Sequence, residues 1–259
     1  MIAEMVLALA VGGWLIYRWN HKILRRSSPL FLLLIIVGIL LVLTAGIIMS
    51  AGLSSSAMCI LYVFFLVTGM TLILANLLVK NWRIYKIFSN RRADAVQLSD
   101  LQLLAITAFL VVLIWIQFFV YSFAGGTIAL TRLQGKDNPF YVFDLCESPT
   151  AWFQTFQIIA YYVFFAILVV TTGVLGFLTR KAHAGYSESR NIALIIYIYV
   201  CMAIIFIPLY YVQGLSTNSQ DTRYVIVSIS MLILMLATLL ILFLPKILLI
   251  ERTRRHLQD

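Results

Sequence analysis

Long uncharged stretches, separated by short segments rich in Lys and Arg, make up most of the chain. A helix needs about 20 mostly apolar residues to cross the hydrocarbon core of a bilayer, and most stretches reach that length. The uncharged stretch at residues 27–79 is too long for one span, and the small, polar run at 51–56 divides it into two. The pattern predicts an all-α membrane protein, a seven-transmembrane helix bundle with spans at about 1–17, 30–50, 57–80, 102–124, 153–178, 191–212 and 223–245.

Composition narrows the class further. Of 259 residues, 63% are hydrophobic and 11% charged, against about 25% charged in soluble domains. This composition excludes a soluble enzyme and a disordered chain. A nucleic-acid-binding domain is excluded because the net charge of +9 is divided among short segments between the spans. Residues 1–17 reach only about 25 Å as a helix, less than the roughly 30 Å core. We therefore expect residues 1–259 to be one helical domain that begins partway into its first helix.

The distribution of Lys and Arg predicts the orientation. Sixteen of the 19 lie in segments 18–29, 80–101, 179–190 and 246–259, and three lie on the opposite side. Because cytoplasmic loops carry the excess of basic residues, the amino terminus is predicted outside and the carboxyl terminus in the cytoplasm.

The predicted spans contain few residues that could bind a metal or take part in catalysis. No span has an ionisable residue near its centre, and all three histidines lie in cytoplasmic segments. We therefore expect no catalytic residues, no metal site, no cofactor and no enzyme activity. The neutral polar residues are predicted to form hydrogen bonds between helices, with a small-molecule cavity as the alternative. They include Asn76, Gln117, Gln154, Gln157, Thr171, Thr172, Ser228, Ser230 and Thr238.

Three local sequences are more specific than the topology. The third span ends in Lys-Asn-Trp-Arg-Ile-Tyr-Lys-Ile-Phe at 80–88, and the seventh ends in Phe-Leu-Pro-Lys at 243–246. The sixth begins with Glu-Ser-Arg-Asn at 188–191 and carries Phe-Ile-Pro-Leu-Tyr at 206–210. In this order they resemble the membrane domain of class C G-protein-coupled receptors, the metabotropic glutamate and metabotropic GABA receptors. The resemblance covers nearly the whole chain.

The resemblance implies a disulfide between Cys59, at the outer end of the third span, and Cys146, in the loop before the fifth. Both thiols are predicted on the oxidising side, where a bridge is chemically plausible, although two free thiols are the alternative. Cys201, mid-span, is interpreted as a small buried hydrophobe.

The resemblance also implies an ionic contact between Lys80 and Glu188 that favours the inactive bundle. The alternative is that Lys80 extends to the lipid headgroups. Basic residues in the cytoplasmic segments are implied to face a G protein, and attraction to anionic membrane lipid is the simpler interpretation. These residues are Arg83, Lys86, Arg91, Arg92, Arg180, Lys181 and Lys246.

As a whole, the resemblance implies a plasma-membrane receptor that forms homo- or heterodimers and passes a signal to a heterotrimeric G protein. The large extracellular ligand-binding domain of such receptors is missing from this chain, and ligand-binding residues stay unknown. A transporter of neutral solutes, or a receptor-like scaffold that does not couple, is the alternative function.

Overall fold

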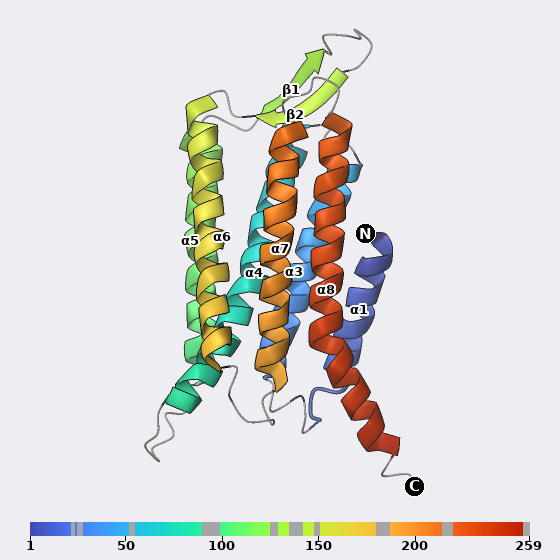
Figure 1. Ribbon diagram of the computed structural model, residues 1–259. Helices are drawn as coiled ribbons and strands as arrows, with labels where there is room; N and C mark the ends of the chain where they lie inside the picture. The colour runs from blue at the N-terminus through green and yellow to red at the C-terminus, as the bar shows by residue number, and fades with distance from the viewer. Residues whose placement is uncertain are drawn as a thin grey trace.

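A computed structural model of the chain describes residues 1–21, 24, 28–51, 55–89, 99–124, 129–134, 142–147, 151–179, 187–213 and 220–255. Within these residues the chain forms a bundle of seven helices and one β-hairpin (Figure 1). The helices are α1 (Ile2–Tyr17), α3 (Pro29–Ser50), α4 (Ser56–Ser89), α5 (Asp100–Ala124), α6 (Ala151–Thr179), α7 (Ser187–Gln213) and α8 (Gln220–Arg255). The predicted seven-helix bundle is therefore confirmed, with a helix at each predicted span.

Six of these helices are long and apolar enough to cross a membrane, and α1 is shorter, with 16 residues. The predicted spans end too early at two points. Helix α4 continues nine residues past Lys80, and α8 continues through Pro245 to Arg255. Charged residues mark where the hydrocarbon ends, but Lys and Arg are good helix formers, so the helices extend beyond it.

A β-hairpin adds to the predicted helix bundle in the segment between α5 and α6. Strand β1 (Ala129–Gln134) pairs antiparallel with β2 (Val142–Glu147), and Leu130 lies opposite Cys146. The hairpin lies over the end of the bundle opposite to the carboxyl terminus, and β1 contacts α4 (Figure 1). On the predicted topology it covers the extracellular end of the bundle.

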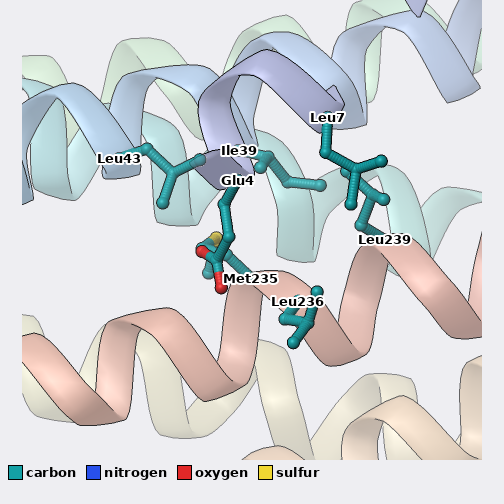
Figure 2. A pocket seen from close by; sticks show the side chains of 7 residues that line it. All are labelled: Glu4, Leu7, Ile39, Leu43, Met235, Leu236 and Leu239. Carbon is teal, nitrogen blue, oxygen red and sulfur yellow. The ribbon is translucent and has the colours of Figure 1, made fainter. Parts of the chain in front are cut away.

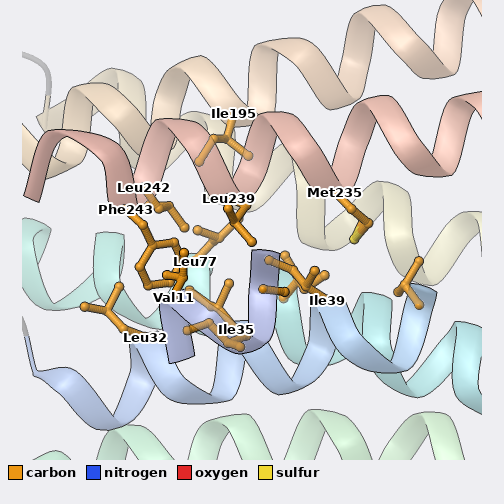
Figure 3. Close-up of a cluster of buried hydrophobic side chains, with 14 of the residues drawn as sticks. Val11, Leu32, Ile35, Ile39, Leu77, Ile195, Met235, Leu239, Leu242 and Phe243 are labelled. Carbon is orange, nitrogen blue, oxygen red and sulfur yellow. The ribbon is translucent and has the colours of Figure 1, made fainter. Parts of the chain in front are cut away.

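Helix α3 is at the centre of the packing. It contacts α1, α4 and α8, and α7 packs on α8. Apolar side chains from these five helices form the main core (Figure 3), whose buried members include Val11, Leu32, Ile35, Ile39, Leu77, Ile195, Met235, Leu239, Leu242 and Phe243. Helices α5 and α6 pack against α4, and α6 has the smallest buried share of the six candidate spans, as expected for a helix in contact with lipid.

Among the described residues, hydrogen bonds between helices also lie within this apolar packing. The Trp115 indole donates to the Thr68 hydroxyl at 3.0 Å and joins α5 to α4. Asn81 Nδ2 donates to the Thr172 carbonyl at 3.2 Å and joins α4 to α6. The hydroxyls of Tyr199 and Thr238, 3.2 Å apart, join α7 to α8. Each such bond stabilises a membrane bundle by about 0.6 kcal/mol on average, so they orient helices that van der Waals packing holds together.

Candidate functional site

The cytoplasmic end of α4 contains the run of residues that resembles class C receptors, and it is helical throughout. No Gly or Pro interrupts the chain between Lys80 and Ser89, so the backbone hydrogen bonds continue out of the membrane. Arg83 and Lys86 consequently lie on a helix, whereas the sequence analysis places them in a loop. A rigid helix holds these side chains in a defined direction relative to the neighbouring helices.

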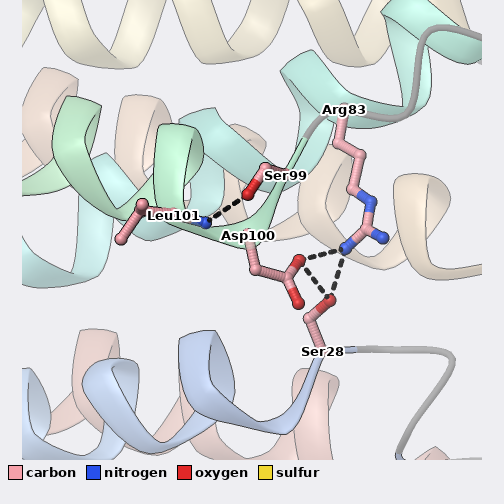
Figure 4. Close-up of polar contacts among 5 residues, drawn as sticks. All are labelled: Ser28, Arg83, Ser99, Asp100 and Leu101. Atoms are coloured by element: carbon pink, nitrogen blue, oxygen red, sulfur yellow. Dashed lines mark hydrogen bonds and ion pairs between the residues drawn. The ribbon is translucent and has the colours of Figure 1, made fainter.

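Arg83 is the centre of a polar contact that joins three elements (Figure 4). Its Nη1 donates to Asp100 Oδ1 at 3.0 Å, and Asp100 is the first residue of α5. The same nitrogen donates to the hydroxyl of Ser28, which precedes α3. Ser28 Oγ in turn lies 3.4 Å from Asp100 Oδ1, to which it donates. We call Ser28, Arg83 and Asp100 the Arg83 triad; it links the cytoplasmic ends of α3, α4 and α5.

Local structure places the two partners of Arg83. Ser28 has a φ of 50°, which is uncommon for a residue with a side chain, and the rigid ring of Pro29 then begins α3. At the start of α5, the Ser99 hydroxyl accepts a hydrogen bond from the Leu101 amide at 3.2 Å. This cap fixes the first turn of α5, where the carboxylate of Asp100 also interacts favourably with the helix dipole.

The ion pair of the triad is open to water, with side-chain exposures of 35% for Arg83 and 63% for Asp100. Exposed pairs of this kind contribute about 0–1 kcal/mol. The triad can therefore bias the arrangement of three helix ends, but it is weak enough to break when the cytoplasmic face changes shape.

A double-mutant cycle should detect this coupling. We expect Arg83→Ala and Asp100→Ala to show a coupling energy of about 0.5–1 kcal/mol in unfolding of the purified protein at low salt. Screening should remove most of it at about 1 M salt. Lys86, one turn further along α4, is the control and should show no coupling to Asp100. Equal coupling for the two basic residues would contradict a specific Arg83 contact.

Lys80 and Asn81 lie one turn before Arg83 and are both buried, with Lys80 only 7% exposed. Asn81 makes the hydrogen bond to the Thr172 carbonyl described above, so α4 is fastened to α6 at this depth. A lysine is rarely buried this far unless its ammonium group has a polar or acidic partner. The structure thus places the Lys80 side chain inside the bundle and not on its outer surface.

The other residues singled out in the sequence are placed less completely. Glu188 belongs to α7, but its side chain is not among those the structure describes, and Arg91, Arg92, Arg180 and Lys181 lie outside the described residues. Lys246 is half-buried on α8. Cys59 is buried and disulfide-bonded, whereas Cys201 is a free thiol. Cys146 is in β2, and its side chain is likewise outside the described set.

The sequence analysis missed Ser28 and Asp100. The signal for Asp100 is the Ser-Asp pair at 99–100, because Ser and Asp just before an apolar run are typical of a helix start. No comparable signal marks Ser28, since its contact depends on how three helix ends meet. Residues 129–134 show no strict alternation of apolar and polar side chains, so the sequence carries no clear period-two signal for the hairpin.

Comparisons with known proteins identify the family of this chain. Residues 1–246 match the family model described as "7 transmembrane sweet-taste receptor of 3 GCPR". Among relatives from Dictyostelium discoideum, metabotropic glutamate receptor-like protein E is 24% identical over 98% of this chain, protein M 26% over 95% and protein P 25% over 95%. The matches cover 30%, 32% and 17% of those proteins, so the chain spans about a third of their length or less. The chain belongs to the class C family of G-protein-coupled receptors.

Proposed function

We propose that this chain is a receptor membrane domain that passes a signal to a heterotrimeric G protein through an equilibrium between an inactive and an active bundle. The observation that carries the proposal is the burial of Lys80 at the cytoplasmic end of α4, a helix that contacts α7, whose first turn contains Glu188. Family membership supports a receptor and not an enzyme. The two states and the G protein are our inference.

The restraint that we propose is an ion pair between Lys80 and Glu188. Helix α4 contacts α7, and Glu188 is the second residue of α7, on the same face of the bundle as the end of α4. A buried ammonium needs a partner of opposite charge or several acceptors, and Glu188 is an acidic residue that α7 brings to this end. The pair would hold α7 close to α4 in the inactive bundle.

The Arg83 triad supports a division of the cytoplasmic face into a fixed and a movable part. It joins the ends of α3, α4 and α5, and the Asn81 contact adds α6. None of these described contacts involves α7. When the Lys80–Glu188 pair breaks, α7 can move outward while the other helix ends keep their positions. A ligand shifts this equilibrium only by its difference in affinity for the two states.

The surface that such a movement would uncover is basic. Its basic residues include Lys86 and Lys246, which are half-buried. On α4, Trp82 is 41% exposed, and its ring centroid lies 6.1 Å from that of Tyr85. We propose that these basic residues, with Arg83, Arg91, Arg92, Arg180 and Lys181, face the G protein. We further propose a Cys59–Cys146 disulfide, plasma-membrane location and homo- or heterodimers, as family membership suggests.

A charge exchange tests the restraint and the coupling together. We expect Lys80→Glu and Glu188→Lys each to raise basal nucleotide exchange on a responsive G protein about fivefold, the factor that corresponds to about 1 kcal/mol. The double exchange should return the rate to that of the unmodified protein, because it restores the pair with reversed polarity. The measurement is nucleotide exchange on a panel of purified heterotrimers, in membranes with matched amounts of receptor.

The control is Arg252→Glu, which reverses a charge on the exposed cytoplasmic part of α8 and should leave the rate unchanged. Raised rates in both single variants without rescue in the double variant would contradict the ion pair. Flat rates for every well-folded variant and every G protein would contradict coupling and favour a receptor-like scaffold.

A further inference from the structure

The outward side of α4 near its cytoplasmic end carries an exposed aromatic residue and, one turn beyond it, a basic residue. Around the helix, Asn81 bonds to α6, Arg83 bonds to α5 and Ile84 is buried in the bundle. Trp82 and Lys86 are four residues apart and therefore lie one above the other, on the side that these contacts leave open. Trp82 is 41% exposed and Lys86 is partly exposed, and the end of α4 projects past the neighbouring ends of α5 and α6 (Figure 1). This side of the helix is therefore open to the surroundings of the bundle.

The polar groups on this side have no partner within the described part of the protein. The indole N–H of Trp82 and the ammonium group of Lys86 form no hydrogen bond or ion pair there, and neither does the hydroxyl of Tyr85, whose ring centroid lies 6.1 Å from that of Trp82. Neither α4 nor the adjoining α6 contains an acidic residue, and Asp100 of α5 is bonded to Arg83. We call Trp82, Tyr85 and Lys86 the outer α4 face; it offers one positive charge and two neutral donors to a partner outside the bundle.

The outer α4 face lies at the boundary between hydrocarbon and water. The Arg83–Asp100 ion pair, which begins at the next residue of α4, is open to water, whereas residues 56–79 of the same helix contain no charge. Trp and Tyr favour this boundary because their apolar rings carry a polar N–H or O–H group, and a lysine here extends its ammonium group toward the headgroups. On the predicted orientation these are the headgroups of the cytoplasmic leaflet, which contains the anionic lipids.

We propose that the outer α4 face binds the headgroup of an anionic phospholipid from the cytoplasmic leaflet, with the lipid phosphate between the Lys86 ammonium group and the Trp82 indole N–H. Charge complementarity selects the class of lipid, because the face has a positive charge and no acidic group that could pair with the amine of a zwitterionic headgroup. The inference does not depend on G-protein coupling. The lipid reaches Lys86 from the side of the membrane, whereas a G protein would reach it from the cytoplasm.

The test uses the 259-residue chain in phosphatidylcholine vesicles that contain a trace of a photoactivatable probe lipid. One probe is phosphatidylglycerol, and the matched probe is phosphatidylcholine with the same acyl chains and reactive group. The measurement is the ratio of labelling by the two probes, mapped by mass spectrometry on peptides from the cytoplasmic ends of α4, α5 and α6. We expect the ratio to favour phosphatidylglycerol and Lys86→Gln to lower it about fivefold, the factor for the loss of one basic residue near an anionic surface. Lys86→Arg should retain the ratio, because it keeps the charge.

Two further variants separate this face from the general attraction of a basic protein for anionic lipid. Arg252→Gln removes the same charge from the exposed cytoplasmic part of α8 and should leave the labelling ratio on α4 unchanged. Trp82→Leu keeps an apolar side chain at the boundary but removes the indole N–H, and should lower the labelling by phosphatidylglycerol. An excess of inorganic phosphate in the buffer should not displace the lipid, because the membrane holds the headgroup at the face.

Three outcomes would overturn the proposal. The first is an unchanged ratio in the Lys86→Gln protein, or an equal fall in the Arg252→Gln protein, since the attraction would then belong to the whole cytoplasmic side. The second is displacement of the lipid by inorganic phosphate, which would indicate a site for a soluble anion. The third is crosslinking of residue 82 to a second copy of the chain in the same vesicles, with equal labelling by the two lipids.

Discussion

Replacing Gly38 with valine is expected to destabilise the bundle by at least about 3 kcal/mol, the upper part of the range for overpacked cores. A Cβ atom on Gly38 would lie 2.8 Å from the Gly69 carbonyl oxygen and 2.8 Å from Cγ1 of Ile73. A Cβ on Gly69 would lie 2.7 Å from the Gly38 carbonyl oxygen. The backbones of α3 and α4 are therefore in direct contact at these two glycines.

The contact cannot relax cheaply because the nearest atoms include a backbone carbonyl oxygen on each side. Moving the Gly69 carbonyl means shifting α4, and α4 carries the contacts to α5, α6 and the hairpin. Helices in membranes associate through close van der Waals packing, and small residues at the interface permit it. We expect α3 to separate from α4 in the Gly38→Val and Gly69→Val variants, and to a smaller degree in Gly38→Ala.

Gly13 provides a matched control. It lies inside α1, and nothing approaches within 4 Å of a Cβ built there. Gly13→Val changes the same residue type in another helix and should cost less than about 1 kcal/mol, or stabilise slightly. The measurement is thermal unfolding in detergent, monitored by the reaction of a fluorescent dye with the free thiol of Cys201. Similar melting temperatures for the Gly38 and Gly13 variants would contradict the direct contact.

The positions of the helices could be predicted from the sequence because hydrophobic thickness is a simple constraint. Their ends could not. Pro245 was interpreted as the end of the last span, yet α8 passes through it and bends away from the bundle near its cytoplasmic end (Figure 1). Proline removes one backbone hydrogen bond, which bends a long helix without ending it when the residues on both sides favour helix.

Four of the nine neutral polar residues named for the spans bond within their own helices and not between helices. Thr238 does bond to another helix, but Thr171, Thr172 and Ser230 donate to carbonyl groups in their own helices. Asn76 also donates within its helix, to the Leu72 carbonyl. A carbonyl three or four residues earlier is always within reach of these short side chains. The sequence shows where polar groups occur, but not which rotamer and partner they select.

The Arg83 triad shows the same limit at the candidate site. Arg83 is conspicuous in the sequence because it belongs to the run that resembles the family, yet its partners lie 17 and 55 residues away. Nothing in the intervening sequence encodes the distance between those helix ends. Glu4 lies beside Ile39 and Leu43 of α3 (Figure 2). This position depends likewise on the offset of α1 along α3, which only tertiary packing determines.

Removing either half of the proposed disulfide is the second change from which we expect a large effect. Cys59 is fully buried and disulfide-bonded, and it packs with Ile48, Ile60, Tyr62 and Phe153 at the end of the bundle near the hairpin. The chain has three cysteines, and Cys201 is free. This supports Cys146 as the partner. Cys146 lies in β2, and β1, the strand paired with β2, contacts α4.

We expect Cys59→Ser and Cys146→Ser each to lower the free energy of unfolding by about 2–5 kcal/mol, the usual cost of losing a native disulfide. Cys201→Ser is the control, because it replaces the free thiol and should cost much less. Unfolding followed by tryptophan fluorescence suits all variants, since it needs no free thiol. A reductant should destabilise the unmodified protein and leave both serine variants unchanged.

The double variant is decisive because two residues that act through one bond cannot contribute separately. If Cys59 and Cys146 form the bridge, the Cys59→Ser, Cys146→Ser protein should be no less stable than either single variant, and it can be more stable because no orphaned thiol is left to form wrong disulfides. Additive losses would contradict the pairing. Loss of stability in Cys59→Ser together with an unaffected Cys146→Ser protein would require another partner for Cys59, and the hairpin would then be held over the bundle by its contacts with α4 alone.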